Sequence, residues 1–512
     1  MAILGSGMAG GLLARQLRRG LPGLRIGVFD KTVASSYKVG ESTVEIASSH
    51  LIRKVGLSRY LYEQHLPKNG LRYFFDDPER RTELVAMSEV GTVNLPFHPA
   101  FQVDRSRLDA DLAEMNQQQG IGVHRGARVR DLELGREGAP HRFCVEREGS
   151  VESVECGWLV DATGRTGLLA RSLGLRIAEQ EHRLHAVWGR FEGVADVDDW
   201  GDPGFSARVR HTCRGISTLH FCYPGYWIWF IPLRGGLTSI GFVGQPPVEP
   251  ARLRSEAGFR AFLESHVGIA SLLRDAKAVD LGALKNFSYG TQRFFSADRW
   301  GLVGESAAFP DPLYSPGADF IALECDYLCD LVERDLGGAT AAELEGRVEL
   351  YDGFMRFRYD AAMRLYRGLY GMLGSFEAMR LKWDFDIGCY YNLWVDPYLK
   401  DQHLDERYLR RQLRQQRFVL QGLSNFADLF RKVEARLRDN GDYHRRNRGA
   451  FSHGLENIDF LEEVGLPRSS RAVLEKTAEI FNGVRRRGLA LLGREAGEDL
   501  PLSAMMTPRP LA

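Results

Sequence analysis

The chain has 512 residues, which is too long for one small hydrophobic core and predicts two or three substructures. Lys plus Arg and Asp plus Glu both number 67, so the formal net charge is zero. This balance argues against nucleic acid or an anionic membrane surface as a partner, and it leaves small molecules as the expected ligands.

The cysteines and the apolar segments narrow the class of protein further. The cysteines form no CxxC pair and no His/Cys cluster, which argues against a structural zinc site and against a secreted disulfide framework. They are Cys144, Cys156, Cys213, Cys222, Cys325, Cys329 and Cys389. The sequence lacks a stretch of about 18 uninterrupted apolar residues, and its start lacks the basic region of a signal peptide. We therefore expect no metal site, no transmembrane segment and a cytoplasmic location.

The first thirty residues follow the order of a dinucleotide-binding unit. A short apolar run is followed by Gly5-x-Gly7-x-x-Gly10, a helical pattern, a second apolar run and Asp30. Glycines in such a loop let the backbone approach a pyrophosphate, and the acid binds ribose hydroxyls. The alternative is a tight turn whose glycines only pack a helix on a strand. Because Met1 already lies in the first expected strand, we expect the natural start a few residues upstream.

Two further glycine turns follow apolar strands later in the chain. Residues 159–165 read LVDATGR and residues 300–307 read WGLVGESA, while residues 102–109 open a helical stretch. Three such turns spread over about 300 residues resemble the FAD-binding flavoprotein monooxygenase superfamily and not a simple NAD dehydrogenase. The resemblance spans roughly residues 1–330.

The resemblance implies a set of FAD contacts. The three glycines of the first loop would hold the pyrophosphate, Asp30 the adenosine ribose, and Arg105 the flavin, although Arg105 also fits an ordinary surface salt bridge. Gly304-Glu305 stands where the superfamily usually has Gly-Asp, whose acid contacts the ribityl chain. The implied cofactor-binding residues are Gly5, Gly7, Gly10, Asp30, Ser42, Arg105, Gly304, Glu305, Pro312 and Gly317.

Residues 226–233 read YWIWFIPL, which is unusual for a surface and for an ordinary core. With a side-chain period of two, Trp227, Trp229 and Ile231 share one face of a strand. Tyr226, Ile228 and Phe230 share the other, so the strand should be buried on both faces. Its aromatic residues fit a plain sandwich strand. Within an FAD fold, however, the string W-x-W-x-I-P resembles the signature of flavin-dependent halogenases, often called tryptophan halogenases.

A second match involves Lys68. Such halogenases carry a lysine early in the chain, after a V-G-E-S-like stretch, that projects between flavin and substrate. Here residues 39–43 read VGEST and residues 66–72 read LPKNGLR, so Lys68 is the corresponding position. The alternative for Lys68 is a solvated loop lysine.

The resemblance also implies a reaction. Reduced flavin, supplied by a separate flavin reductase, oxygen and a chloride or bromide ion produce hypohalous acid. Lys68 hydrogen-bonds this acid or becomes a chloramine, and a lowered lysine pKa favours the second course. Trp227 and Trp229 form a partition that keeps substrate away from the flavin. Ser315 and Gly317 lie in the loop that binds the halide.

Two positions depart from the family pattern in residues 311–317, DPLYSPG. Tyr314 replaces a glutamate found in halogenases of free tryptophan, which predicts an already activated ring, a phenol or pyrrole, as substrate. Pro316 replaces a threonine and removes one backbone N–H donor from the halide loop. The proline is the main sequence argument for a hydroxylase instead.

The expected fold class is α/β, with a Rossmann-like FAD-binding domain, an inserted mixed or antiparallel β-sheet substrate domain and a helical C-terminal region. We expect residues 1–330 to form the first domain, with its substrate sheet at about residues 175–290, and residues 331–512 to form a helical substrate cap. Long helical stretches are expected at residues 328–336 and 408–437.

Two segments of the C-terminal region have open interpretations. The aromatic residues 383–399, WDFDIGCYYNLWVDPYL, fit a helical core or a roof over the substrate. The basic stretches 407–417 and 485–487 fit solvated helix faces better than a docking site for a carrier protein that holds a tethered substrate.

The function predicted from the sequence is halogenation of an electron-rich aromatic compound through Lys68, with Trp227, Trp229 and Tyr314 as the other catalytic candidates. The alternative is an FAD-dependent monooxygenase of an aromatic or lipid-like substrate. A flavin-dependent reductase of unsaturated lipids and a catalytically idle flavin-binding scaffold are further alternatives.

Overall fold

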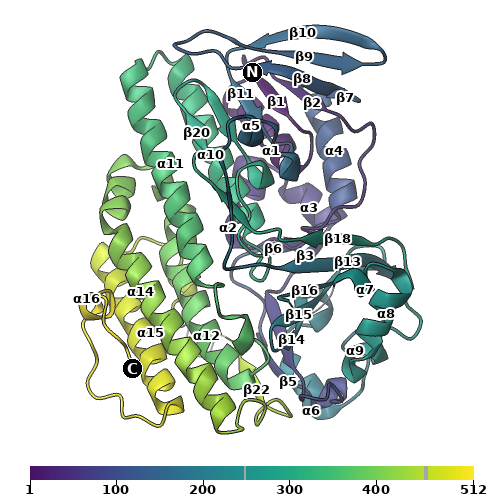
Figure 1. Ribbon diagram of the computed structural model, residues 1–512, viewed down its shortest axis with the longest axis vertical. Helices are drawn as coiled ribbons and strands as arrows, with labels where there is room; N and C mark the ends of the chain where they lie inside the picture. The colour runs from purple at the N-terminus through teal and green to yellow at the C-terminus, as the bar shows by residue number, and fades with distance from the viewer. Residues whose placement is uncertain (247–249, 455–458) are drawn as a thin grey trace.

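The computed structural model describes residues 1–246, 250–454 and 459–512. A six-stranded sheet in the order β20-β21-β11-β1-β2-β7 forms the upper right part of the molecule (Figure 1). Its strands are β1 Ala2–Leu4, β2 Gly27–Asp30, β7 Gly122–Arg125, β11 Leu159–Asp161, β20 Phe295–Ser296 and β21 Trp300–Leu302. All neighbouring pairs except β20–β21 are parallel. The glycine loops therefore follow the carboxyl ends of parallel strands and meet at one edge.

Helices cover this sheet. Helix α1 (Met8–Gly20) buries Leu12, Leu13 and Leu17 and exposes Arg19, so its sequence is amphipathic with the helical period. It packs against α4 (Arg105–Gln118) and α10 (Gly317–Leu336). The expected Rossmann-like unit is confirmed by this arrangement.

A nine-stranded mixed sheet lies below the first, in the order β17-β13-β16-β15-β14-β4-β5-β22, with β18 paired to β13. Its strands are β4 Leu71–Phe75, β5 Ser88–Gly91, β13 His185–Glu192, β14 Thr218–Tyr223, β15 Tyr226–Pro232, β16 Leu237–Gly244, β17 Lys277–Ala278, β18 Gly282–Lys285 and β22 Phe451–His453. The sheet also contains strands from outside residues 175–290, the range expected for the substrate sheet. The wholly buried strand β4 pairs in parallel with β14, and β22 pairs with β5.

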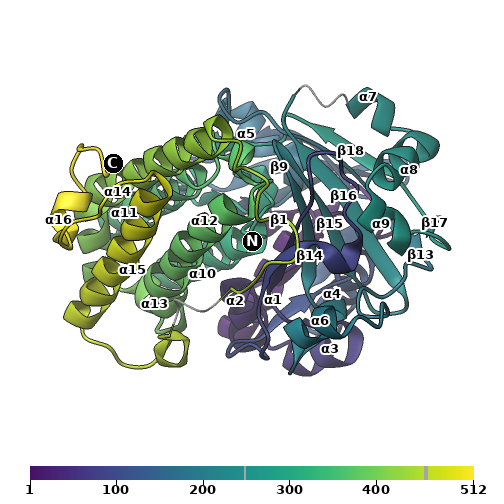
Figure 2. The same ribbon diagram turned by 90° about the horizontal axis from the view of Figure 1, so that it is seen from below.

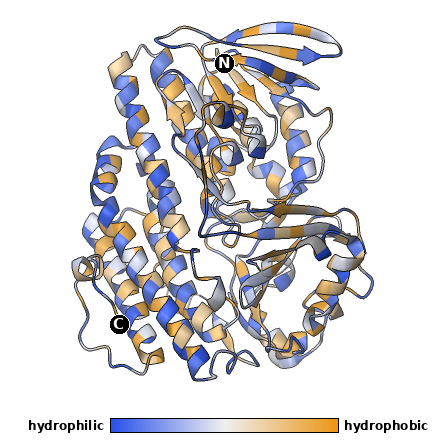
Figure 3. Ribbon diagram, viewed as in Figure 1, coloured by the Kyte–Doolittle hydropathy of each residue, from blue (hydrophilic) through white to orange (hydrophobic). Residues whose placement is uncertain are grey.

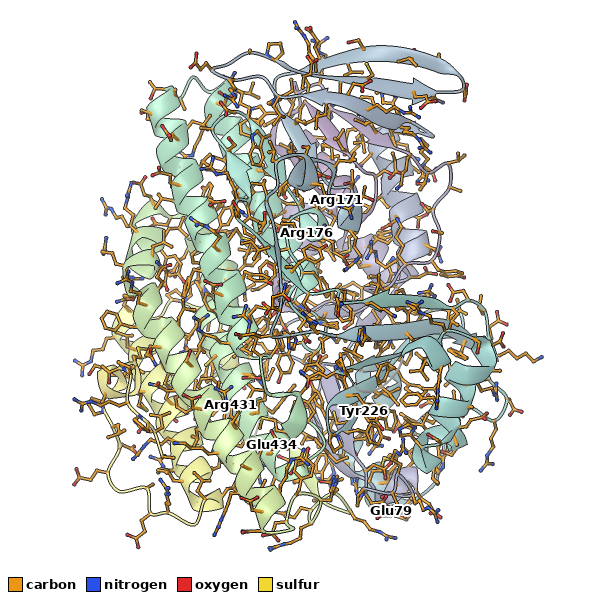
Figure 4. All side chains as sticks on the ribbon, viewed as in Figure 1. Glu79, Arg171, Arg176, Tyr226, Arg431 and Glu434 are labelled. Carbon is orange, nitrogen blue, oxygen red and sulfur yellow. The ribbon has the colours of Figure 1, made fainter. Side chains whose placement is uncertain are left out.

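Strand β15 is buried on both faces, as its sequence predicts. Trp227, Trp229 and Ile231 belong to the core that joins the sheet to the first sheet and the C-terminal helices. Ile228 and Phe230 belong to a second core. That core is closed by α8 (Glu256–Glu264) and α9 (Val267–Leu272). Tyr226, labelled in Figure 4, lies at the edge of this core.

The C-terminal region is helical and runs along one whole side of both sheets (Figures 1 and 2). Its main helices are α11 Ala341–Arg364, α12 Phe376–Cys389, α14 Glu406–Asp439, α15 Ser470–Leu491 and α16 Leu502–Met505. Helix α11 packs on α14, and α12 packs on α15. The outer helices alternate hydrophilic and hydrophobic residues along their length (Figure 3). Both expected helical stretches lie inside helices, α10 and α14.

Shorter elements complete the fold. The remaining strands are β3 Leu66–Lys68, β6 Ala100–Gln102, β8 Arg128–Glu133, β9 His141–Arg147, β10 Ser150–Cys156, β12 Arg176–Ala178 and β19 Tyr289–Thr291. The remaining α-helices are α2 Glu45–Ser49, α3 Ser58–Gln64, α5 Leu168–Ser172, α6 Pro203–Ser206, α7 Pro250–Leu253 and α13 Asp396–Leu399. Within the described ranges, none of the helices combines the length and the apolar character that crossing a bilayer requires.

Candidate active site

Three adjoining cavities lie where the two sheets and the C-terminal helices meet. The glycine-loop cavity, about 800 Å³, contains Gly5, Gly7 and Asp30 in its lining. The tryptophan cavity, about 130 Å³, is lined by Trp227 and Trp229 among others. These two cavities share the lining residues Met8, Val39, Arg105, Glu305 and Ile321. The aromatic cavity, about 140 Å³, lies beyond them and shares Pro316 with the tryptophan cavity.

The first glycine loop has the shape of a ligand cradle. Gly5 has φ +104°, and a Cβ there would lie 2.4 Å from the carbonyl oxygen of Ala162. A Cβ at Gly10 would lie 2.0 Å from the carbonyl oxygen of Gly5, so both positions require glycine for packing. Gly7 differs, because a Cβ there would meet no atom closer than 3.5 Å. Its missing side chain leaves space in front of the uncapped N-terminus of α1, where a pyrophosphate fits.

Asp30 ends β2 at the rim of the glycine-loop cavity. Its Oδ2 accepts hydrogen bonds from the backbone N–H and the hydroxyl of Ser6, at 2.6 and 2.8 Å. Its Oδ1 accepts from the N–H and the hydroxyl of Thr32. Burial opposes ionisation, but these hydrogen bonds outweigh it and lower the pKa of Asp30. The result is a carboxylate held at the position expected for binding a ribose.

Arg105 lies at the junction of the glycine-loop and tryptophan cavities. Its guanidinium pairs with Asp109 at 3.3 Å and donates to the carbonyl oxygen of Val39. The side chain is only 14% exposed, so the alternative of an ordinary surface salt bridge does not describe it. The geometry fits a cation that can contact a ligand spanning both cavities.

Gly304 and Glu305 follow β21 and face the same junction. Gly304 has φ +67°, and its N–H donates to the buried Glu324 carboxyl. Glu305 lines both cavities and lies 3.4 Å from the Arg165 guanidinium. Arg165 also lines the glycine-loop cavity, and the sequence interpretation did not single it out.

The two tryptophans are fixed by hydrogen bonds from their indole N–H groups. Trp229 donates to the hydroxyl of Ser239, and Trp227 donates to the hydroxyl of Tyr370, both at 3.2 Å. Tyr370 in turn donates to Asp311, which also binds the His182 ring. The same Asp311 accepts from the N–H of Leu313 at the start of the DPLYSPG loop, so one carboxylate holds both Trp227 and this loop.

Gly241 on β16 leaves the space that the Trp229 ring occupies. A Cβ at Gly241 would lie 2.1 Å from the ring, so Gly241→Ala must displace it. We expect this change to destabilise the protein by about 1–3 kcal/mol, the usual cost of overpacking. Thermal unfolding measures the loss. Gly346→Ala is the matched control, because a Cβ there meets nothing within 4 Å, and it should unfold no earlier than the parent protein. Equal unfolding temperatures of Gly241→Ala and the parent protein would contradict the packing argument.

A row of aromatic rings lies between the tryptophan cavity and the aromatic cavity. The ring centroids of Trp227 and His220 are 5.0 Å apart, those of His220 and Tyr73 4.6 Å, and those of Tyr73 and Trp383 4.9 Å. Trp227 and His220 line the first cavity, and Trp383 lines the second. Burial, with a smaller contribution from the Lys68 charge, lowers the pKa of His220 to about 3. These neutral rings form a wall between the cavities, which we call the aromatic wall.

Lys68 ends β3 and lines the aromatic cavity. Its ammonium donates to the Ser42 hydroxyl at 2.7 Å and to the carbonyl oxygen of Thr43 at 2.8 Å. Ser42 lines the tryptophan cavity and accepts from the Ser315 hydroxyl at 2.9 Å. Lys68 is 2% exposed, so it is not a solvated loop lysine. The resemblance implies that Lys68 and the tryptophans both lie between flavin and substrate. In the structure they line adjoining cavities, which the hydrogen bond between Lys68 and Ser42 links.

The surroundings of Lys68 make it an unusually weak base. Burial lowers its pKa from 10.5 to about 8, and the nearby Glu45 and Asp319 carboxyls only partly offset this. Both acids line the aromatic cavity. Burial raises the pKa of Asp319 to about 7, although the N–H of Ala47 and the hydroxyl of Tyr390 donate to it. The ammonium is therefore the main form at neutral pH, and the neutral amine becomes the main form above about pH 8.

The DPLYSPG loop lies between the cavities. Ser315 has φ +55°, which is strained for a residue with a side chain, and its N–H donates to the carbonyl oxygen of Pro312. Pro316 carries no N–H and precedes the first turn of α10, which has no side-chain cap. Gly317 and Ala318 of this turn line the tryptophan cavity, as do Pro312 and Ser315. The helix N-terminus points its free backbone dipoles toward that cavity.

Tyr314 of the same loop faces the other way, into the aromatic cavity. Its hydroxyl donates to Asp386 at 2.7 Å, and burial raises its pKa well above the ordinary value. The segment expected to form a core or a roof also lines this cavity. Its contributing residues are Trp383, Asp386, Ile387, Cys389, Tyr390, Tyr391 and Trp394.

Some arginines of the basic C-terminal stretches form ion pairs within the chain. Arg410 pairs with Glu406, and Arg486 with Asp499. Charged side chains farther along α14, including the labelled Arg431 and Glu434 (Figure 4), also have partners, Asp428 and Arg438 respectively. At these positions the arginine charge is balanced within the chain, as on a solvated helix face. Within the described part of the chain, His, Cys, Asp and Glu side chains form no group suited to a metal ion.

Comparison with known proteins shows what the chain is similar to in fold and in sequence. The model of the FAD binding domain matches residues 1–218. Flavin-dependent halogenase chlA of Dictyostelium discoideum is 27% identical over 443 residues, which cover 78% of this chain and 71% of the relative. A 1H-pyrrole-2-carbonyl-[peptidyl-carrier protein] chlorinase of Pseudomonas fluorescens is 26% identical over 376 residues, 68% of this chain and 80% of that protein.

The chain is a relative of the flavin-dependent halogenases. Among solved structures, halogenase PltM aligns with a TM-score of 0.66 at 17% identity, covering 99% of this chain and 98% of that one. The halogenase CmlS aligns with a TM-score of 0.59 at 21% identity, covering 85% of this chain and 72% of that one. These likenesses confirm the α/β fold class, and the sequence relatives confirm the recognised family and an FAD-binding, oxidoreductase-type enzyme.

Several residues around the cavities of this halogenase relative escaped the sequence interpretation. They are Glu45, Arg165, Asp311, Asp319, Arg358 and Asp386. Arg165 ends the glycine turn at residues 159–165, and the others stand outside the glycine turns and the W-x-W motif. Asp386 and Arg358 lie in helical stretches whose patterns resemble ordinary core helices, so only their burial beside polar neighbours marks them.

Proposed function

We propose that this protein is a flavin-dependent halogenase of an electron-rich aromatic substrate, phenol- or pyrrole-like. The proposal rests chiefly on one observation: the buried Lys68 ammonium lies in the aromatic cavity and is hydrogen-bonded to Ser42, which lines the adjoining tryptophan cavity. A small oxidant made in the tryptophan cavity would therefore meet Lys68 before it reached a substrate in the aromatic cavity.

The first two cavities fit FAD. The space in front of Gly7 and the N-terminus of α1 would hold the pyrophosphate, Asp30 the adenosine ribose, and Glu305 the ribityl chain. Arg105 and Pro312 would flank the flavin ring in the tryptophan cavity. When bound and reduced by a separate flavin reductase, FAD supplies the oxygen activation that converts chloride or bromide to hypohalous acid.

The halide would be held by the loop before α10. Ser315 offers its hydroxyl, and Gly317 and Ala318 offer the first N–H groups of a 20-residue helix. A helix N-terminus favours an anion through its free N–H groups and its dipole. Ala318 can therefore replace the donor that Pro316 removes. The proline remains the observation that favours the alternative, an FAD-dependent monooxygenase.

The aromatic wall supports separation of substrate and flavin. Rings whose centroids are about 5 Å apart are in contact and leave no opening between them, so a phenol in the aromatic cavity would not reach the flavin through this wall. The small hypohalous acid would cross beside the wall, where Ser42 of the tryptophan cavity contacts Lys68 of the aromatic cavity. Lys68 would then act on that acid in one of two ways. The ammonium can hydrogen-bond it, or the neutral amine can take the halogen and release water.

The substrate class is supported by the cavity and by the relatives. Tyr314 stands where tryptophan halogenases carry a glutamate, so the substrate ring must supply its own electron density. One structure of the similar halogenase PltM contains phloroglucinol and FAD. The chlorinase relative of Pseudomonas fluorescens acts on a pyrrole bound to a peptidyl-carrier protein, so tethering to a carrier belongs to the proposal as an alternative to a free substrate.

A single experiment tests the proposed function. The protein is incubated with FAD, a flavin reductase, NADH, oxygen, chloride or bromide, and simple phenols or monochlorodimedone, and product masses are followed. Halogenated products are expected. A gain of oxygen without halogen would select the monooxygenase, and neither product would select the lipid reductase or the idle scaffold.

The rate of halogen transfer should depend on pH through Lys68. Because the pKa of Lys68 is lowered to about 8, the neutral amine increases as the pH rises through that value. If the neutral amine carries the halogen, the single-turnover rate of halogenation should rise with pH and reach half its maximum near pH 8. The rate of flavin reoxidation should not show this rise. A rate that falls through the same range would assign the ammonium as the active form. A halogenation rate that does not change through this pH range would contradict a role for Lys68.

A further inference from the structure

The aromatic cavity contains a buried carboxylate whose hydrogen bonding is incomplete. Asp386 of α12 is 2% exposed. Its Oδ2 accepts a hydrogen bond from the Tyr314 hydroxyl at 2.7 Å and another from the Lys382 ammonium. Its Oδ1 is buried and has no hydrogen-bond partner among the described residues. Buried carboxylate oxygens rarely remain without a donor, because the lost hydration is not replaced.

The partners of Asp386 fix its position and bind only one of its two oxygens. Lys382 is one helical turn before Asp386 and 1% exposed, so the two form a buried i,i+4 ion pair. Tyr314 comes from the loop before α10 and lines the same cavity. Both donors bind Oδ2, and Asp386 itself lines the cavity. A ligand that carries an O–H or N–H group can supply the missing donor to Oδ1.

The size and walls of the cavity limit the ligand. Its volume, about 140 Å³, is close to that of an apolar cavity of about 150 Å³ that holds one benzene ring. Trp383, Tyr390 and Trp394 contribute flat surfaces to the lining. A single aromatic ring fits this space.

We propose that Asp386 accepts a hydrogen bond from the ring hydroxyl of a single-ring phenol and thereby positions that ring relative to Lys68. The inference rests on the proposed function, since it specifies the substrate of the same site. The carboxylate that tryptophan halogenases carry in the loop is absent here, where Tyr314 stands. Tyr314 and Lys382 instead hold a carboxylate from α12 at the cavity wall, where it acts as a positioning residue.

The test compares two probes of the same shape, meta-cresol and meta-xylene, which differ by one hydroxyl. Their affinities for the FAD-loaded protein are measured by ligand-observed NMR titration without reductase, so no halogenation is needed. Asp386→Leu combined with Lys382→Met removes both buried charges together, because removing one partner alone leaves a buried charge unpaired. Tyr314→Phe is a second, milder variant that keeps the ion pair.

The double variant should lower the preference for meta-cresol over meta-xylene by roughly 10- to 100-fold, the value of one hydrogen bond to a charged group. The meta-xylene affinity, the FAD affinity and the melting temperature serve as internal controls for folding. Tyr314→Phe should lower the preference by a smaller factor. Absent binding of meta-cresol, or an unchanged preference in a folded double variant, would overturn the proposal.

Because these titrations need no turnover, their outcome is separate from that of the proposed function. A wild-type protein that halogenates phenols but binds both probes equally would refute the role of Asp386 and leave the halogenase intact. A protein that prefers meta-cresol but yields no halogenated product would refute the halogenase and leave the phenol site intact.

Discussion

Replacing Lys68 by alanine is expected to abolish halogenation while flavin reoxidation continues. The ammonium contacts Ser42 and Thr43 and lines the aromatic cavity, so its loss removes the group that we propose receives the oxidant. It leaves the glycine loop and Asp30, which would hold the cofactor in the proposed function, unchanged. A nucleophile or acid–base group of this kind contributes at least about 100-fold to the rate. The measurements are halogenated product per turnover and the rate of flavin reoxidation.

Two further variants isolate the amine from its packing. Lys68→Met keeps most of the buried volume and should be as inactive as the alanine variant. Lys277→Ala is the matched control, since Lys277 is an exposed lysine on β17 outside all three cavities. Halogenation retained by Lys68→Ala at the parent rate would remove Lys68 from the mechanism.

Gly7→Ala is expected to abolish tight FAD binding and leave the protein folded. The φ of Gly7 is −69°, which alanine adopts without strain, and its Cβ would meet only side-chain atoms at 3.5 and 3.6 Å. The added methyl group fills the space in front of the α1 N-terminus that the pyrophosphate needs. We expect the FAD affinity to fall by about 100-fold or more, equivalent to about 2.7 kcal/mol. Titration of the apoprotein with FAD measures this loss.

Gly20→Ala on the same helix is the control for Gly7→Ala. A Cβ there meets nothing within 4 Å, and the residue lies at the opposite end of α1 from the cavity. This variant should bind FAD like the parent protein. If Gly7→Ala bound FAD as tightly as the parent protein, the cofactor would not approach this loop. The assignment of the glycine-loop and tryptophan cavities to FAD would then fail.

Local sequence patterns were sufficient to predict much of the fold and part of the candidate site. The loop Gly5-x-Gly7-x-x-Gly10, the acid Asp30 and the period-two strand around Trp227 are each defined within a few residues of sequence. Local steric rules and side-chain alternation decide such features, so they can be predicted without the rest of the chain. Lys68 was identified by resemblance, and its burial was not predictable from a Pro and Asn-Gly context.

The sequence by itself determined the α/β class, the nucleotide loop and the two buried faces of β15, because these depend on period and backbone conformation. Only the tertiary structure decided the composition of the site. Strand β4 joins β14 across about 145 residues, and Asp386 reaches Tyr314 across 72. Contacts between such distant segments depend on how whole layers pack, which no local pattern encodes. The same packing withdraws Lys68, Asp319 and Asp386 from water, and this burial shifts their pKa values.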